Sequence, residues 1–182
     1  QGADFGALFC TFNVNGQPNK ADCYFKNIQG EVIDKFTVTS LVGIEDTGID
    51  PSGTTLIGAD LTDTSLTGMK LTGADLSLSN LAGADLSGKD LTDTKLRGAD
   101  LTDTNLTGVD LSGMYLTGTI LTGADLSNTN LTGVDLSGKD LTGTILTGAD
   151  LTNAVLTDAI LTGANLENVT LEKATLLDTN LD

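Results

Sequence analysis

The chain has 182 residues and a formal net charge of −16, from 25 acidic and 9 basic residues, and it contains no histidine. This length fits one domain with a substantial core. A charge this negative repels nucleic acid and anionic membranes, so a charged partner should be basic or a cation. Without histidine there is no imidazole base and no histidine-ligated metal site. No apolar run approaches the ~18 residues of a membrane-spanning helix, so we expect no membrane insertion.

The first 55 residues differ in composition from the rest of the chain. They hold all five phenylalanines, both cysteines and both prolines. A spacing of five residues continues weakly here, in small–Asp–large triplets at 3–5 and 21–23 and in apolar residues at 28, 33 and 38. Residues 13–20 interrupt this spacing. We predict that residues 1–55 form an irregular N-terminal cap with degenerate five-residue repeats and an inserted loop, because solenoid ends need atypical repeats.

The two cysteines, Cys10 and Cys23, flank that interruption. A disulfide between them would close a loop of about 14 residues and stabilise the fold by about 3 kcal/mol in the chain-entropy model. The chain also begins at Gln1 rather than methionine. Both features favour a mature exported protein. The alternative is a pair of buried thiols in a trimmed chain.

From Leu56 to Leu181, a leucine stands at every fifth position, 26 times without interruption. On an α-helix five residues advance about 500°, so the leucines would form no stripe. On a flat strand an odd spacing sends successive leucines to opposite faces. A leucine core with this period therefore requires a corner in every repeat, which predicts a solenoid of very short strands.

The other positions of the repeat agree with this interpretation. The residue two before leucine, here called the inward slot, is mostly small and should share the leucine's side. Asp or Asn commonly precedes leucine and Thr or Ser follows it, and both should face outward. Glycine is frequent two residues after leucine, where the chain must turn.

Triplets such as Ala59-Asp60-Leu61 and Ala164-Asn165-Leu166 make the chain similar to the pentapeptide-repeat family over at least residues 54–182. The resemblance implies an all-β fold, a right-handed quadrilateral parallel β-helix with four pentapeptides per coil. Residues 56–182 would then form about 6.5 coils, roughly 31 Å tall at the usual strand spacing. Family members occur in the cytoplasm, the periplasm and the thylakoid lumen. We expect an extracytoplasmic location (periplasm, thylakoid lumen or secreted), with the cytoplasm left open.

Stacking every twentieth residue lets the outer columns be written from the sequence. Only Asp90 and Asp110 then stack among the ten aspartates that precede a leucine, and Asp158 stacks on Asp178 at the turn position. Two carboxylates fall short of a Ca²⁺ shell, so we predict solvated surface acids and no metal, cofactor or catalytic site.

Two lysines depart from the family pattern. Lys89 and Lys139 occupy the inward slot, where we expect local accommodation of the long side chain and assign no functional role. Met69 and Met114 stand in the same kind of slot.

Apolar residues at the outward position before leucine are candidates for a protein contact. They lie on two adjacent faces and are Tyr115, Ile120, Val155 and Ile160. A patch of this kind on a monomer marks an interaction site.

The pattern favours a non-enzymatic, rigid acidic scaffold that docks onto a protein partner or a larger assembly. The uncovered last coil, ending at Leu181, also suggests an end-to-end homodimer. The main alternative is a DNA mimic that binds DNA gyrase, as some family members do. Residues 56–182 carry 18 acids and 6 bases, against about 18 phosphate charges on equally long B-DNA. A further alternative is binding of ice or another surface through threonine-rich faces.

Overall fold

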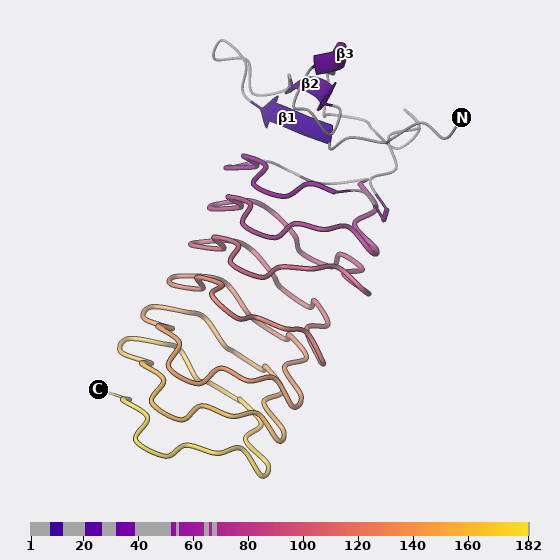
Figure 1. Ribbon diagram of the computed structural model, residues 1–182. Helices are drawn as coiled ribbons and strands as arrows, with labels where there is room; N and C mark the ends of the chain where they lie inside the picture. The colour runs from indigo at the N-terminus through magenta and orange to yellow at the C-terminus, as the bar shows by residue number, and fades with distance from the viewer. Residues whose placement is uncertain are drawn as a thin grey trace.

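The computed structural model describes the backbone of three N-terminal strands and, in full, residues 52–53, 55–63, 66 and 69–181. The repeat region is a right-handed quadrilateral β-helix, as predicted, and Figure 1 shows its coils stacked from the N-terminal to the C-terminal end. Parallel bridges join residues 20 apart, as in the column Asp60, Asn80, Asp100 and Ile120. Four pentapeptides therefore complete one coil.

The corners explain the residues that surround each leucine. Two positions after leucine the backbone has positive φ, which is 73° at Gly118 and 58° at Asn153. Glycine adopts this region freely, and Asn and Asp tolerate it better than other residues. The Asp or Asn before leucine accepts an amide hydrogen bond two residues on, as from Thr142 N–H to Asp140 Oδ1 at 2.9 Å. The sequence analysis had assigned these acids only to the solvent side.

The core is a stack of leucines with small residues between them. The leucines from Leu56 to Leu161 that the structure describes are at most a few per cent exposed. Buried hydroxyls in the inward slot donate to carbonyls, as Thr104 Oγ1 does to Leu81 O at 2.8 Å. In the part of the chain described with side chains, no buried side-chain polar atom lacks a partner. The polar groups of the described interior are therefore all hydrogen-bonded.

The last coil is the exception to this burial. Leu171, Leu176 and Leu181 continue the leucine column but are exposed, because no further coil lies over them. Within the described residues, no helix is long and apolar enough to cross a membrane.

The N-terminal strands form a different structure. Strands β1 (Leu8–Phe12), β2 (Ala21–Lys26) and β3 (Val32–Val38) make an antiparallel sheet in the order β1-β2-β3, with a bulge at Phe25/Lys26. This pairing differs from the parallel stacking expected of degenerate repeats at 21–23 and at Val38. The physical reason is that each strand runs extended over five to seven residues and pairs along its length with its neighbour, which leaves no corner after every fifth residue. The boundary at residue 55 and the loop at 13–20, which lies outside the described residues, stay predictions.

We expect burial alone to separate two otherwise identical substitutions. Leu126→Ala removes a fully buried side chain and should lower the free energy of unfolding by about 2–5 kcal/mol. Leu177→Ala, at a turn where the side chain is 62% exposed, should change it by less than about 0.5 kcal/mol. Chemical denaturation measures both, and equal losses would contradict the leucine-column core.

Candidate functional site

Main-chain hydrogen bonds between successive coils, here called the ladder, are interrupted around residues 91–96 and 110–115. The ladder is intact on both sides, where Gly88 N–H donates to Thr107 O and Gly98 N–H donates to Thr117 O, each at 3.0 Å. Between these two bonds, five main-chain amides would donate to the adjacent coil if the repeat were regular. Among the described residues, none of the five reaches a backbone acceptor. They belong to Leu91, Asp93, Leu96, Asp110 and Tyr115.

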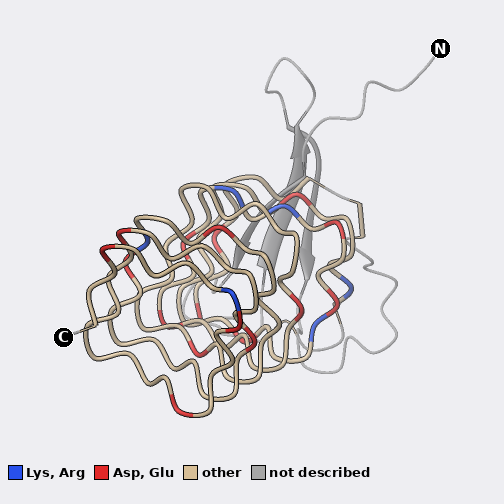
Figure 2. Ribbon diagram, turned by 90° about the horizontal axis from the view of Figure 1, so that it is seen from below, with Lys and Arg blue, Asp and Glu red and all other residues tan. Residues whose placement is uncertain are grey.

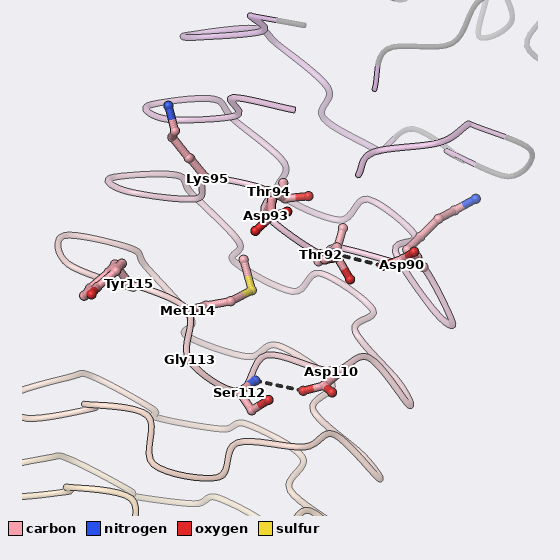
Figure 3. A pocket seen from close by; sticks show the side chains of 12 residues that line it. Asp90, Thr92, Asp93, Thr94, Lys95, Asp110, Ser112, Gly113, Met114 and Tyr115 are labelled. Carbon is pink, nitrogen blue, oxygen red and sulfur yellow. Dashed lines mark hydrogen bonds between the residues drawn. The ribbon is translucent and has the colours of Figure 1, made fainter. Parts of the chain in front are cut away.

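A hollow of about 490 Å³ occupies this interruption, and we call it the Tyr115 cleft. Residues 89–95 line one wall and Asp110 with residues 112–115 line the other. In Figure 3 the Met114 side chain points into the space between the two coils. A second hollow of about 430 Å³ shares Thr94, Lys95 and Tyr115 with the cleft and extends to Ser77 and Arg97. Tyr115 therefore stands between two concave surfaces.

Turn glycines give independent evidence that the coils separate here. A Cβ added at Gly123 would collide with the carboxylate of Asp103, which lies one coil below. Gly113 occupies the equivalent place above Asp93, yet a Cβ there would meet nothing within 4 Å. The Asp103 side chain therefore lies against the turn at Gly123, whereas the Asp93 side chain does not lie against the turn at Gly113.

The interruption coincides with bulky residues in the inward slot. Lys89 and Met114 stand where regular coils carry buried alanines such as Ala74 and Ala99. A longer side chain at a packed position forces the surrounding backbone to move. A second run of missing ladder bonds separates residues 113–121 from residues 132–140, beside Met114 and Lys139. Residues 112–116 consequently make no main-chain hydrogen bond to either adjacent coil within the described residues.

The two lysines replace ladder bonds with their own ammonium groups. Lys139 Nζ donates to Thr119 O at 2.7 Å, and Lys89 Nζ donates to Met69 O at 3.4 Å. In a regular coil these carbonyls would accept the amides of Asp140 and Asp90. Burial lowers the pKa of both lysines below the usual value. The expected local accommodation is therefore a specific contact with the preceding coil.

The carboxylates of the cleft are ionised turn residues. The 20-residue spacing predicts that Asp90 and Asp110 stack directly, but no β-bridge joins these two residues. The hydrogen bond from the Thr92 side chain lowers the pKa of Asp90, and that from Ser112 lowers the pKa of Asp110, each with help from the amide of the same residue. Lys95 Nζ turns away to Asp75 Oδ2 at 3.1 Å. Across the described part of the chain, no three Asp, Glu or Cys residues are grouped to hold a metal ion.

The four predicted contact residues do not form one continuous patch in the structure. Tyr115 is 86% exposed, Ile120 is 47% exposed, and Val155 is half-buried. Asp135 bridges to Val155 and Asp140 bridges to Ile160, so charged coils lie between Tyr115 and Val155 and between Ile120 and Ile160. Of these four contact residues, Tyr115 alone lines the two hollows described above. Sequence reasoning missed Ile145, which is 40% exposed and occupies the same outward position.

A family model described as pentapeptide repeats matches the chain with eight copies at residues 48–77, 74–113, 115–148 and 149–182. The chain belongs to this family. The four matched ranges of the chain include the coils that carry the Tyr115 cleft, and the first of them begins after strand β3.

Solved structures of other pentapeptide-repeat proteins are similar to this one. HetL from the cyanobacterium Nostoc sp. strain PCC 7120, involved in heterocyst differentiation regulation, is 35% identical over 70% of this chain, with a TM-score of 0.44. The match spans 62% of HetL. QnrB1, a plasmid-mediated fluoroquinolone resistance protein, is 17% identical over 72% of this chain and 78% of its own, with a TM-score of 0.37. An Arabidopsis thaliana thylakoid-lumen protein is 29% identical over 63% of this chain and 66% of its own, with a TM-score of 0.25. No curated protein sequence matches the chain at a significant level.

A bulky residue placed in a regular inward slot should reproduce the interruption. Ala124 is fully buried beside intact ladder bonds, so Ala124→Met should lower the free energy of unfolding by about 1–3 kcal/mol. Met114→Ala should cost less than Ala124→Met, because it removes a half-buried side chain and lets the coils close. Chemical denaturation compares the two, and a neutral Ala124→Met would show that inward bulk is not the cause.

Lys139 should give the protein a distinctive pH dependence. The folded state releases this proton at a lower pH than the unfolded chain, whose lysine pKa is near 10.5. Between the two pKa values the unfolded chain binds more protons, so stability should rise with pH. The difference in unfolding free energy between the wild type and Lys139→Met, followed from neutral pH to above 10.5, isolates this effect. Lys173→Met, at an exposed lysine, is the control. A difference that stays flat or falls would contradict burial of the ammonium.

Proposed function

We propose that the chain is a non-enzymatic, rigid acidic scaffold that binds a protein partner, and that Tyr115 with its cleft is the contact surface. One observation carries the proposal. Residues 112–116 are released from both adjacent coils and present Tyr115, which at 86% is the most exposed large hydrophobic residue described, beside a hollow. Regular coils keep the corresponding bonds, as residues 101–106 do to residues 120–125.

The physical chemistry of such a surface supports binding. Tyrosine is among the residues enriched at the energetic centres of protein interfaces. Ladder bonds at Gly88 and Gly98 join the two coils at either end of the cleft, whereas residues 112–116 are bonded to neither adjacent coil. A preorganised surface loses little conformational entropy on association.

The cleft offers little for acid–base catalysis. Its carboxylates Asp90 and Asp110 have lowered pKa values, so at neutral pH they are ionised and weak as bases. The sequence has no histidine to act beside them. These features support a binding role over an enzymatic one.

The charge pattern supports a protein scaffold over the DNA mimic that binds gyrase. Most bridged aspartates stack on neutral residues, as Asp100 does on Ile120 and Asp125 on Ile145. Figure 2, which looks along the stack, shows acidic residues on several sides of the coil outline instead of on one face. The proposal expects no effect of the chain in a DNA gyrase supercoiling assay.

We also propose that Cys10 and Cys23 form a disulfide and that the protein works outside the cytoplasm. The register of β1 and β2 makes these two residues direct Cα partners. Directly opposite residues on antiparallel strands have Cα atoms about 4.5–5.5 Å apart, within the roughly 4.4–6.8 Å range of disulfides. Disulfides persist in oxidising compartments. The intact mass of the natively isolated chain should rise by two hydrogens on reduction, and an unchanged mass would reject the bond.

Replacement of Tyr115 should remove partner binding without disturbing the fold. Tagged wild-type chain captures its partner from an extract of the source organism, and Tyr115→Asp should lower that capture about tenfold or more. Ile145→Asp is the matched control, because Ile145 is also outward but lies on an intact ladder, with its amide 3.0 Å from Ala124 O. Equal capture by both variants, or loss with Ile145→Asp alone, would contradict the assignment of the surface.

A further inference from the structure

The walls of the Tyr115 cleft carry main-chain groups that face an absent neighbour. The amides of Leu91 and Leu96 on one coil would donate to the carbonyls of Asp110 and Tyr115 on the next, and these bonds are missing in the described chain. The amide of Tyr115 likewise does not reach the carbonyl of Thr94. Backbone donors and acceptors in parallel strands point toward the adjacent strand, so both walls are open strand edges.

Open strand edges are surfaces for adding a strand. An extended segment of another protein pairs its main chain with such an edge, and its alternate side chains fill the neighbouring pockets. The two intact bonds at Gly88 and Gly98 bound the opening. The corner at Asp93 and Gly113, which have φ of 58° and 71°, divides it into two straight faces. The cleft therefore suits a short extended segment rather than a long strand.

The charges in the cleft select the kind of segment. Asp90, Asp93 and Asp110 line it. One oxygen of Asp90 accepts the amide of Thr92 and one oxygen of Asp110 accepts that of Ser112, each at 2.9 Å. The side chains of Thr72 and Asn130 also hydrogen-bond to Asp90 and Asp110, respectively. The nearby lysines are engaged, because Lys89 binds Met69 O and Lys95 pairs with Asp75. The lining thus holds three carboxylates against two ammonium groups, a small negative excess that complements lysine or arginine.

We infer that the Tyr115 cleft takes a basic, extended segment of a partner protein by strand addition. The main chain of the segment pairs with the open edges at residues 91–96 and 110–115, and its cationic side chains meet Asp90 and Asp110. Met114, whose unbranched thioether chain adapts to different shapes, lies at the base, and Tyr115 packs against the entering segment. This inference rests on the proposed function and names the chemistry of the partner.

The test uses a fluorescein-labelled peptide of alternating lysine and valine residues, with fluorescence anisotropy as the readout. A second probe carries the same side chains but N-methylated valines, which removes alternate main-chain donors and keeps the charge. The wild-type chain should bind the first probe, and N-methylation should weaken binding at least about tenfold through the lost hydrogen bonds. Because both arms use the wild-type protein, the comparison does not depend on a variant folding.

Matched variants locate the binding. The double change Met114→Ala with Tyr115→Asp restores the Gly-Ala-Asp-Leu sequence found at residues 73–76 and should close the cleft, reducing binding at least about tenfold. Ile145→Asp should bind the probe as the wild type does. Equal binding of the two probes would indicate attraction by charge alone and overturn the inference. Absence of binding at about 100 µM, or unchanged binding by the double variant, would also overturn it.

The outcome separates this inference from the proposed function. If Tyr115→Asp still abolishes capture of the partner while the peptide fails to bind, the scaffold function stands and strand addition is wrong. If the peptide binds as expected while partner capture does not depend on Tyr115, the cleft accepts strands but is not the partner's contact surface.

Discussion

The whole structure depends on one geometric constraint, the closure of a coil after 20 residues with space inside for a leucine and one small residue per corner. Each coil then lies close enough for its amides to reach the carbonyls of the next, as Leu101 N–H reaches Ile120 O at 2.9 Å. Ladder bonds, burial of the leucines and the positive-φ turns are all consequences of this spacing. At the Tyr115 cleft the residues too long for the inward slot interrupt the ladder, while Leu91 and Leu116 stay 2% exposed and the turn keeps positive φ.

The period of five was sufficient to predict a solenoid of very short strands, because leucine at that spacing is compatible with neither a helix nor a flat strand. The quadrilateral coil of four repeats came from the resemblance to the pentapeptide-repeat family. The inward position of Ala74 and the outward position of Ile120 followed from the period and agree with their burial. The turn role of the aspartates was missed, since a pattern of outward residues does not reveal that Asp140 accepts an amide two residues on. Strands β1–β3 depended on non-local antiparallel pairing, which the five-residue step did not indicate.

The candidate site was visible in the sequence only as isolated departures. Lys89 and Met114 were recognisable as oversized for their slot, and Tyr115 as an outward aromatic. The sequence did not indicate that these residues act on the same pair of coils. It also did not indicate that the displaced backbone leaves an open strand edge, because residue identity does not specify how far the coils move apart. The near-duplicate units at 106–130 and 131–155 sharpen the contrast, because Met114 and Tyr115 in one correspond to Lys139 and Asp140 in the other. In the second unit the ammonium of Lys139 binds the carbonyl left open, and the outward residue is charged.

The central claim is that the ladder is open at residues 91–96 and 110–115 and closed on either side. Residue-resolved amide hydrogen exchange on the free chain tests it directly. The amides of Leu91, Leu96 and Tyr115 should exchange at least about a hundredfold faster than those of Leu101, Leu126 and Ile145, which are bonded in the ladder. Equal protection of the two groups would show a continuous ladder and contradict the account.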